Sequence, residues 1–294
     1  MDWTSRRINA LVENALREDH AISDSTTLLA IELPREVQAE VVAKQECVLA
    51  GLGLIPRVYD AFRNLALVQQ PAVHLPPVVV SSRPEIFDGM RLQPGATVAV
   101  MRGDARQLLS CERVILNFLQ HLSGIATQAR KFVDAVRNTG VKVLDTRKTV
   151  PGMRLLEKYA VTCGGALNHR ADLSDGILIK NNHLAIAGSI SAAVGRAQQG
   201  RSPDQLIEVE VRSLPELEEA LASGAERILL DNMTPKQVRK AVEAVGGRAS
   251  IEVSGGMTLQ NIRDFAVPGV QYISVGAVTH SAPAVDLSMR MRPV

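Results

Sequence analysis

The pattern of hydrophobic and polar positions changes near Val141, where short apolar runs begin to alternate with longer stretches of helical spacing. The six runs are VKVLDT, GILIK, LIEVEV, RILLD, ASIEVSGG and YISVGA, and the stretches between them include SLPELEEALASGA and TPKQVRKAVEAVG. Nearly continuous apolar runs are typical of parallel strands that are covered on both faces. The alternation with helices predicts a parallel α/β sheet, open or closed. Since a closed barrel of this kind has more strands, we expect an incomplete barrel.

The first part of the chain has a mixed pattern. Helical spacing predicts a helix up to about Arg17 and another after the glycines of GLGLIPRVYDAFRN. The alternation in EVQAEVVAKQECVLAG predicts a strand and a turn, prolines interrupt PAVHLPPVVVSSRPE, and DGMRLQPGATVAVMRGD predicts a strand between two turns. A long helix is predicted from Ala105 to Val136, with a kink at Ser123-Gly124. These elements together predict a small α+β sandwich.

Polar residues cluster where the predicted strands of the second half end. The strand ends carry Asp145-Thr146-Arg147-Lys148, Lys180, Glu210, Asp231, Ser254-Gly255-Gly256 and Gly276. In a barrel of βα units the carboxyl ends of the strands gather at one mouth, where active sites are built. We therefore predict the active site at this mouth.

Five basic side chains are expected to face that mouth. They are Arg147, Lys148, His169, Arg170 and Lys180. Arginine binds planar carboxylates or phosphates with two hydrogen bonds, so the group predicts an anionic ligand. A solvated surface pair is the alternative for Arg147 and Lys148. Lys180 closes an apolar run and must be paired or functional there, and a Schiff-base role as in aldolases is a competing interpretation.

A helix between the two basic pairs is expected to return the chain to the mouth. We predict that Pro151 opens it and that Gly164-Gly165 ends it. The buried stripe is predicted to contain Leu155, Leu156, Tyr159 and Ala160.

Two acidic residues, Glu210 and Asp231, end successive strands. Their carboxylates suit a hydrated Mg²⁺ ion or ribose hydroxyls, although they could also balance the nearby cations. Glu208 shares a strand face with Glu210, so the sequence does not decide which of the two glutamates faces the site.

The last two strands lead into VSGGMT and VGAVTH, which combine small residues with expected helix starts. Backbone amides in such turns bind phosphate. His280 either adds a donor there or caps a helix, and His183 follows Lys180 closely enough to support the site. The remaining histidines considered, His20, His74 and His121, have no metal-ligand spacing and are expected to be structural or exposed.

Composition narrows the class of protein. The net charge of +2 gives no reason to expect nucleic-acid or membrane binding, and no run reaches the roughly 18–20 apolar residues that span a bilayer. The N-terminal MDWTSRRINALVENALRED predicts an amphipathic helix rather than a signal peptide. Three cysteines without a CxxC pair fit a reducing environment, so we expect a cytoplasmic protein.

Several long motifs carry a resemblance to a known family. They are ERVILNFLQHLSGIAT, LDTRKTVPGMRLLEKYAVTCGGALNHR, ILIKNNH, IEVEV, ILLDNM, EVSGGMTLQNI and YISVGAVTHSAPAVDLSMRM. They resemble the quinolinate phosphoribosyltransferases, the carboxylating nicotinate-nucleotide pyrophosphorylases of NAD synthesis. The resemblance is dense over the barrel half and sparse over the first hundred residues.

The resemblance implies a type II phosphoribosyltransferase fold, in which an N-terminal α/β sandwich over residues 1–115 precedes an incomplete α/β barrel over 116–279. The tail, 280–294, would pack on the first domain. The implied reaction joins quinolinate to the ribose of phosphoribosyl pyrophosphate (PRPP) and yields nicotinate mononucleotide, pyrophosphate and CO₂, with Mg²⁺ as cofactor.

The resemblance also implies roles for single residues. The substrate carboxylates would contact Arg147, His169, Arg170 and Lys180. PRPP would contact Lys148 and Lys180. The ribose and the hydrated metal would be served by Glu210 and Asp231, and the 5′-phosphate would lie among Ser254, Gly255, Gly276 and His280. Catalysis would depend on Lys148, Lys180, Glu210 and Asp231. Arg113 would reach the neighbouring subunit's site, which makes a homodimer the smallest active unit.

Small departures from the family pattern concern substrate choice. Asn181 stands where aspartate is frequent in the family, and Ala171-Asp172 also differs. The alternatives are a related phosphoribosyltransferase acting on another base, including the molybdenum-associated relatives, and a non-catalytic phosphate- or nucleotide-binding barrel. The complete set of basic residues argues against the first, and Glu210 with Asp231 argues against the second.

Overall fold

The computed structural model describes residues 1–31, 34–69 and 75–294. His74 therefore lies outside the described residues. The chain divides into two compact units, of which the first contains residues 1–127 and 282–294 and the second contains 128–281. The sequence-based boundary lay at residues 115 and 116, inside the long helix α4 (Ala105–Ala135).

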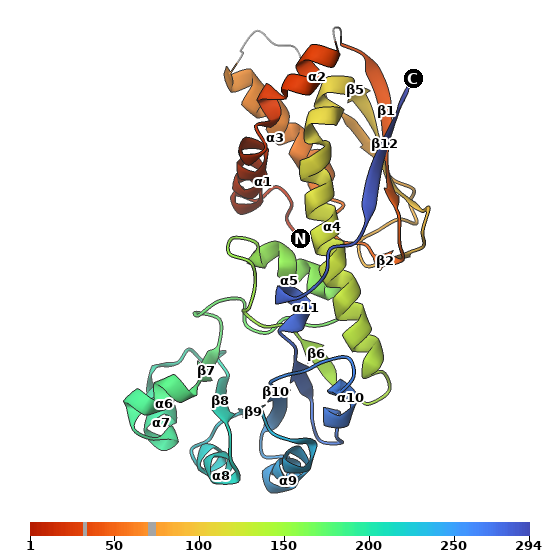
Figure 1. The fold of residues 1–294 in the computed structure, drawn as a ribbon. Helices are drawn as coiled ribbons and strands as arrows, with labels where there is room; N and C mark the ends of the chain where they lie inside the picture. The colour runs from red at the N-terminus through yellow and green to blue at the C-terminus, as the bar shows by residue number, and fades with distance from the viewer. Residues whose placement is uncertain (32–33, 70–74) are drawn as a thin grey trace. The chain divides into compact units, whose positions relative to one another are not determined.

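The first unit is built on an antiparallel sheet in the order β12-β1-β5-β3 (Figure 1). These strands are β1 (Glu36–Ala43), β3 (Val79–Ser81), β5 (Thr97–Asp104) and β12 (Leu287–Pro293). Alternation buries Val37, Ala39 and Val41 of β1, as the sequence pattern predicted. The C-terminal strand β12 pairs with β1 along its length, from Leu287 opposite Ala43 to Pro293 opposite Val37.

The remaining elements of the first unit are short strands and helices. They are α1 (Arg6–Glu18), η1 (Ala21–Ser23), α2 (Ser25–Ala30), β2 (Cys47–Val48), α3 (Leu54–Gln69) and β4 (Arg91–Leu92). The helix α4 continues through Ser123 and Gly124. A side chain at Gly124 would place its Cβ 2.2 Å from the carbonyl oxygen of Pro283, so glycine allows the segment before β12 to pass the helix closely.

The second unit contains six parallel strands in the order β6-β11-β10-β9-β8-β7. The strands are β6 (Lys142–Leu144), β7 (Ile177–Ile179), β8 (Ile207–Val211), β9 (Arg227–Asp231), β10 (Ser250–Ser254) and β11 (Tyr272–Ser274). The consecutive strands β6 and β7 lie at opposite edges. The segment at Leu167 forms a parallel bridge to Leu144 at the free edge of β6. This confirms the predicted fold class, an α/β sandwich followed by an incomplete barrel.

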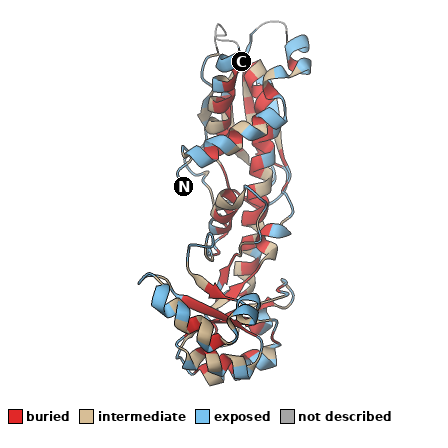
Figure 2. Ribbon diagram, turned by 90° about the vertical axis from the view of Figure 1, so that its left-hand side faces the viewer, coloured by how far each residue is buried: buried red, intermediate tan, exposed pale blue. Residues whose placement is uncertain are grey.

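Helices follow the strands of this sheet. They are α5 (Arg154–Cys163), α6 (Asn181–Ala187), α7 (Ile190–Gly200), α8 (Leu214–Ala222), α9 (Pro235–Val245), α10 (Ile262–Phe265) and α11 (Ala277–His280). Local signals fix their ends, as in α9, where Thr234 and Gln237 form a capping box and Gly246 adopts a left-handed conformation after the last turn. Buried residues follow the strands, while the outer sides of α8 and α9 are exposed (Figure 2).

The two faces of the parallel sheet differ in chemistry. The register places Val209 beside Ile228, and Ile228 beside Ile251, on an apolar face. The opposite face aligns Glu208 with Arg227 and Ser254 with Asp231. The prediction of strands covered on both faces is confirmed by the burial of β8, β9 and β10, but one of the two covered faces carries polar side chains. Their polar residues were present in the sequence, but the register was needed to show that they share one face.

Candidate active site

The carboxyl ends of β7, β8 and β9 bring three predicted residues onto the polar face. Lys180 follows β7, and its Nζ lies 3.5 Å from Oε2 of Glu210. Oε1 of Glu210 accepts a hydrogen bond from Nδ2 of Asn181 at 3.1 Å. Asp231 lies on the same face of the next strand, and its Oδ2 accepts from Nε of Arg212 at 3.3 Å. We call Lys180, Glu210 and Asp231, together with Ser254 and Gly276, the rim.

Lys148 and His280 come together at Gly276. A Cβ added to Gly276 would lie 3.0 Å from Nε2 of His280 and 3.2 Å from Cδ of Lys148, so only glycine leaves both side chains in place. Thr279 Oγ1 also donates to the backbone oxygen of Lys148 at 2.8 Å. The first basic pair is thus joined to the turn after β11, the last strand of the parallel sheet.

The glycines after β10 form a second tight turn at the rim. Gly255 has a φ of +107°, and a Cβ there would lie 2.3 Å from Oδ1 of Asn232. The backbone amide of Asn232 in turn donates to the carbonyl oxygen of Ser254 at 2.9 Å. A side chain at Gly255 would be strained by both its conformation and this contact.

A buried ion pair fixes the helix between the two basic pairs. Nζ of Lys158 lies 2.7 Å from Oδ1 of Asp145, and the side chains of both residues are almost completely buried. Lys158 also donates to the carbonyl oxygen of His169 at 2.8 Å, and the amide of His169 donates to Asp145 at 2.7 Å. This network ties α5 and the loop at His169 to the end of β6.

The helix predicted between the two basic pairs agrees only partly with α5. Pro151 lies in a turn and α5 begins at Arg154, so the predicted start was wrong by three residues. Leu156 and Ala160 are buried as predicted, whereas Leu155 and Tyr159 are only half-buried. Glu157 and Lys158 are buried instead. The ion pair with Asp145 stabilises the charge of Lys158 in its buried position. No sequence signal marked Lys158, since a lysine within an amphipathic helix is usually exposed.

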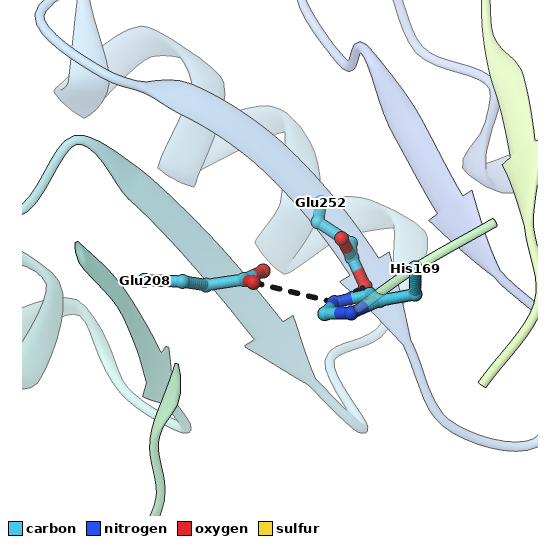
Figure 3. Close-up of side chains that lie close together, drawn as sticks. All are labelled: His169, Glu208 and Glu252. Atoms are coloured by element: carbon cyan, nitrogen blue, oxygen red, sulfur yellow. Dashed lines mark ion pairs between the residues drawn. The ribbon is translucent and has the colours of Figure 1, made fainter. Parts of the chain in front are cut away.

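His169 extends toward the sheet and contacts two glutamates (Figure 3). Its Nε2 lies 3.3 Å from Oε2 of Glu208 and 3.5 Å from Oε1 of Glu252. Its Nδ1 accepts a hydrogen bond from the backbone amide of Arg170 at 2.8 Å. We call His169, Glu208 and Glu252 the interior cluster. No signal in the sequence marks Glu252, because it lies in the middle of β10, two residues before the strand end at Ser254.

The cluster changes the acid-base properties of its members. Burial alone would lower the pKa of His169, but the hydrogen bond to Glu208 and the charges of Glu252 and Glu208 outweigh it and raise the pKa. Burial, together with the charge of Glu208, raises the pKa of Glu252 to about 7. The sequence left open whether Glu208 or Glu210 faces the site. Both lie on the polar face of β8, where Glu208 contacts His169 and Glu210 belongs to the rim.

Arg147 and Arg170 lie close enough for their charges to interact. Burial and then the charge of Arg147 lower the pKa of Arg170. Nη1 of Arg170 donates to the carbonyl oxygen of Gly176, while Nε of Arg147 is buried without a hydrogen-bond partner among the described residues. Two neighbouring guanidinium groups, one with a donor unused, favour an anionic ligand.

A cavity of about 600 Å³ adjoins His169 and Arg170. Its walls also include Glu208 and Arg227, so it reaches the polar face of the sheet. Of the twelve predicted site residues, His169 and Arg170 line this cavity, and the rim residues do not.

The other predicted residues occupy defined positions. Arg113 is exposed on α4 in the first unit. Nδ1 of His183 accepts from the backbone amide of Lys180 at 2.9 Å, which caps the start of α6. Among the described residues, one group has the spacing to hold a metal ion, and it is the interior cluster rather than the predicted pair Glu210 and Asp231. None of the helices described has the length and apolar character to cross a membrane.

Comparison with known proteins gives matches along both units of the chain. Residues 24–123 match the N-terminal domain of quinolinate phosphoribosyl transferase, and residues 125–290 match its C-terminal domain. The chain is 40% identical to a probable carboxylating nicotinate-nucleotide pyrophosphorylase of Bacillus subtilis, with 96% of this chain and 93% of the relative covered. It is also 40% identical to a carboxylating nicotinate-nucleotide pyrophosphorylase of Mycobacterium leprae, with 95% of each covered.

A solved structure shows the same fold. NadC from Streptococcus pyogenes is 39% identical and superimposes with a TM-score of 0.89, with 100% of this chain and 99% of that chain covered. The chain belongs to the quinolinate phosphoribosyltransferase family. The family and the enzyme class, a pentosyltransferase, are confirmed as the sequence motifs predicted.

Proposed function

We propose that this protein transfers the phosphoribosyl group of PRPP to the ring nitrogen of quinolinate and releases pyrophosphate and CO₂. The product is nicotinate mononucleotide, an intermediate of de novo NAD synthesis. The observation that carries the proposal is the adjacency of Arg147 and Arg170 near a sheet face that also bears Glu210 and Asp231. The guanidinium groups suit a dicarboxylate, and the carboxylates suit the ribose and its developing positive charge.

The chemistry needs positioning and electrostatics rather than a covalent enzyme intermediate. The bond between C1 of the ribose and the pyrophosphate breaks as the ring nitrogen donates its electron pair to C1. The ribose gains positive charge in this step, which the carboxylates of Glu210 and Asp231 would stabilise. As CO₂ leaves, the electron pair of the broken C–C bond stays on the ring carbon, where the adjacent pyridinium nitrogen stabilises it. That carbon then takes up a proton from solvent, which gives the product. Lys148 and Lys180 would attract the phosphate groups, and the turn at Gly255 with Gly276 and His280 would hold the 5′-phosphate.

Mg²⁺ fits the donors at the rim. Glu210 and Asp231 offer carboxylate oxygens from adjacent strands, the ligand type that Mg²⁺ prefers, while each already contacts a cation that a hydrated metal could replace. We infer that the two residues would hold the ion through water, and that the bound ion would neutralise pyrophosphate charge.

The Schiff-base alternative has less support. The side chain of Lys180 is half exposed and lies beside the carboxylate of Glu210, so it lacks the desolvated apolar pocket in which Schiff-base lysines are activated. A trapping experiment with borohydride and a carbonyl substrate would expose such a reaction.

The decisive assay supplies quinolinate, PRPP and Mg²⁺ to the purified protein and measures CO₂ and nicotinate mononucleotide. Equal release of both products is expected. Turnover of another pyridine or pyrimidine base in place of quinolinate would favour the related phosphoribosyltransferases, and binding without turnover would favour a nucleotide-binding protein.

We also propose a cytoplasmic homodimer in which Arg113 of the partner subunit completes the site. Arg113→Ala should then inactivate the protein, while an equal mixture with Arg147→Ala should regain activity, because one hybrid site has both arginines. Both variants would be refolded together to exchange subunits, and Arg239→Ala on the exposed side of α9 serves as the control. A mixture as inactive as its components would contradict the shared site.

A further inference from the structure

The interior cluster contains a fully buried carboxylate that the proposed reaction does not use. Glu252 lies in the middle of β10, with Oε1 3.5 Å from Nε2 of His169 and Oε2 3.8 Å from Nη1 of Arg227. Its neighbours Ile251 and Val253 supply the apolar packing of the strand on the other face. Burying a charged side chain costs more free energy than burying an apolar one of similar size. Stability therefore does not explain why a carboxylate lies at this position.

We propose that Glu252 is a positioning residue that, together with Glu208, keeps His169 charged and oriented, so that its Nδ1 can exchange the backbone amide of Arg170 for a hydrogen bond donated to the anionic substrate. This inference rests on the proposed function and deepens it, since it concerns how the substrate carboxylate is held.

Charge balance inside the sheet supports a protonated His169. Glu208 and Glu252 carry two negative charges when ionised, and Arg227 supplies one positive charge beside them. A neutral imidazole would leave one negative charge buried, whereas an imidazolium gives a neutral set. A divalent metal with a neutral imidazole would leave one positive charge in excess. The group of donors therefore suits a proton better than a metal ion.

Three other charged groups lie around His169, and the charge of one of them, Arg170, also interacts with Glu208. They are Asp145 after β6, Lys158 on α5 and Arg170 in the same loop. Asp145 and Lys158 neutralise each other at 2.7 Å. Arg170 presents its backbone amide to the ring, while its guanidinium extends to the carbonyl of Gly176.

The two ring nitrogens of His169 have separate environments. Nε2 faces Glu208 and Glu252, so its proton is held by the carboxylates. Nδ1 accepts from the amide of Arg170, and a second proton on Nδ1 would end that contact and create a donor. His169 and Arg170 line the same cavity, so this donor would be available to an anion held by Arg170. The pKa of His169, which the two glutamates raise, agrees with this assignment.

A direct test follows the imidazole by NMR in protein labelled with ¹⁵N-histidine. His169 is assigned with His169→Gln, and the titration is compared between the wild type, Glu252→Gln and the exposed control Glu243→Gln. Removal of an opposite charge at this distance is expected to lower the pKa of His169 by about one unit or more. An unchanged pKa in folded Glu252→Gln would overturn the proposal. Glu252→Asp keeps the charge and should restore part of the shift, which separates charge from packing.

The kinetic consequence depends on pH. Glu252→Gln should lower kcat/KM for quinolinate about tenfold near pH 8, equivalent to about 1.4 kcal/mol, and less near pH 6, where the imidazole stays protonated. The KM for PRPP should be unchanged. An equal loss at both pH values, or a loss confined to PRPP, would indicate a merely structural role and overturn the inference.

Two outcomes separate this inference from the proposed function. If the wild type fails to turn over quinolinate, the proposed function fails, and the NMR titration still decides the charge of His169. Calorimetric titration of the wild type with Zn²⁺ tests the metal alternative, and tight binding that Glu252→Gln abolishes would replace the proton with a metal ion.

Discussion

The rim and the interior cluster contain the same kinds of charged residue but differ in burial. At the rim, the side chain of Lys180 is 49% exposed beside Glu210. In the interior cluster, the side chain of His169 is 10% exposed and that of Glu252 is fully buried. Contacts at the rim are weak in solvent and can be exchanged for a ligand at low cost. Contacts in the interior are costly to break, so they are suited to holding a binding group in one orientation.

The largest expected effect comes from the arginine pair that we propose binds quinolinate. Arg147→Ala should lower kcat/KM for quinolinate by about a thousandfold, or ~4 kcal/mol, because a charged two-bond contact to a carboxylate is lost. Arg147→Lys should restore little, since an ammonium group cannot form the paired contact. Steady-state kinetics with Arg239→Ala as control would measure this. Full activity of the lysine variant would show that only charge is needed.

The next largest effect concerns stability rather than turnover. Lys158→Met should destabilise the fold by about 3–5 kcal/mol, because Asp145 would be left as a buried, unpaired charge. Urea denaturation measures the change, and Lys240→Met on the exposed side of α9 is the matched control. The double variant Lys158→Met with Asp145→Leu should recover part of the loss. No recovery would mean that Asp145 is needed for its other hydrogen bond, to the amide of His169.

A smaller effect is expected at the rim. Asp231→Asn should raise the Mg²⁺ concentration for half-maximal activity about tenfold, since one carboxylate of the proposed metal site is lost, while stability changes by less than about 1 kcal/mol. The exposed Asp264→Asn is the control. A large loss of stability with an unchanged requirement for Mg²⁺ would place Asp231 with the structural residues instead.

A last effect is a pH dependence of stability that originates in the interior cluster. Glu252 has its pKa raised from 4.5 to about 7, and that of His169 is also raised, so the folded protein binds more protons than the unfolded chain in this range. Stability should therefore be highest below the unfolded pKa values and fall as the pH rises through the folded ones. We expect a decline of about 2 kcal/mol between about pH 5 and pH 7.5, measured by urea midpoints. The decline should be smaller in Glu252→Gln. If that variant kept the pH profile of the wild type, the decline could not originate in the interior cluster.

The sequence determined the order and type of the elements and most of the charged residues of the candidate site. Alternating runs predicted the six parallel strands, and their ends marked Lys180, Glu210 and Asp231. These features depend on local spacing, which a single chain displays directly. Long motifs also identified the family, which the comparisons confirm.

Tertiary structure alone decided which residues meet in the interior. Register placed Glu208, Arg227 and Glu252 on one face, because a strand's face depends on its neighbours as well as on its own alternation. Burial of Lys158 depends on Asp145, a partner thirteen residues away that no helical pattern reveals. A charge in the core is stable only beside its partner, and that distance exists only after the chain has folded.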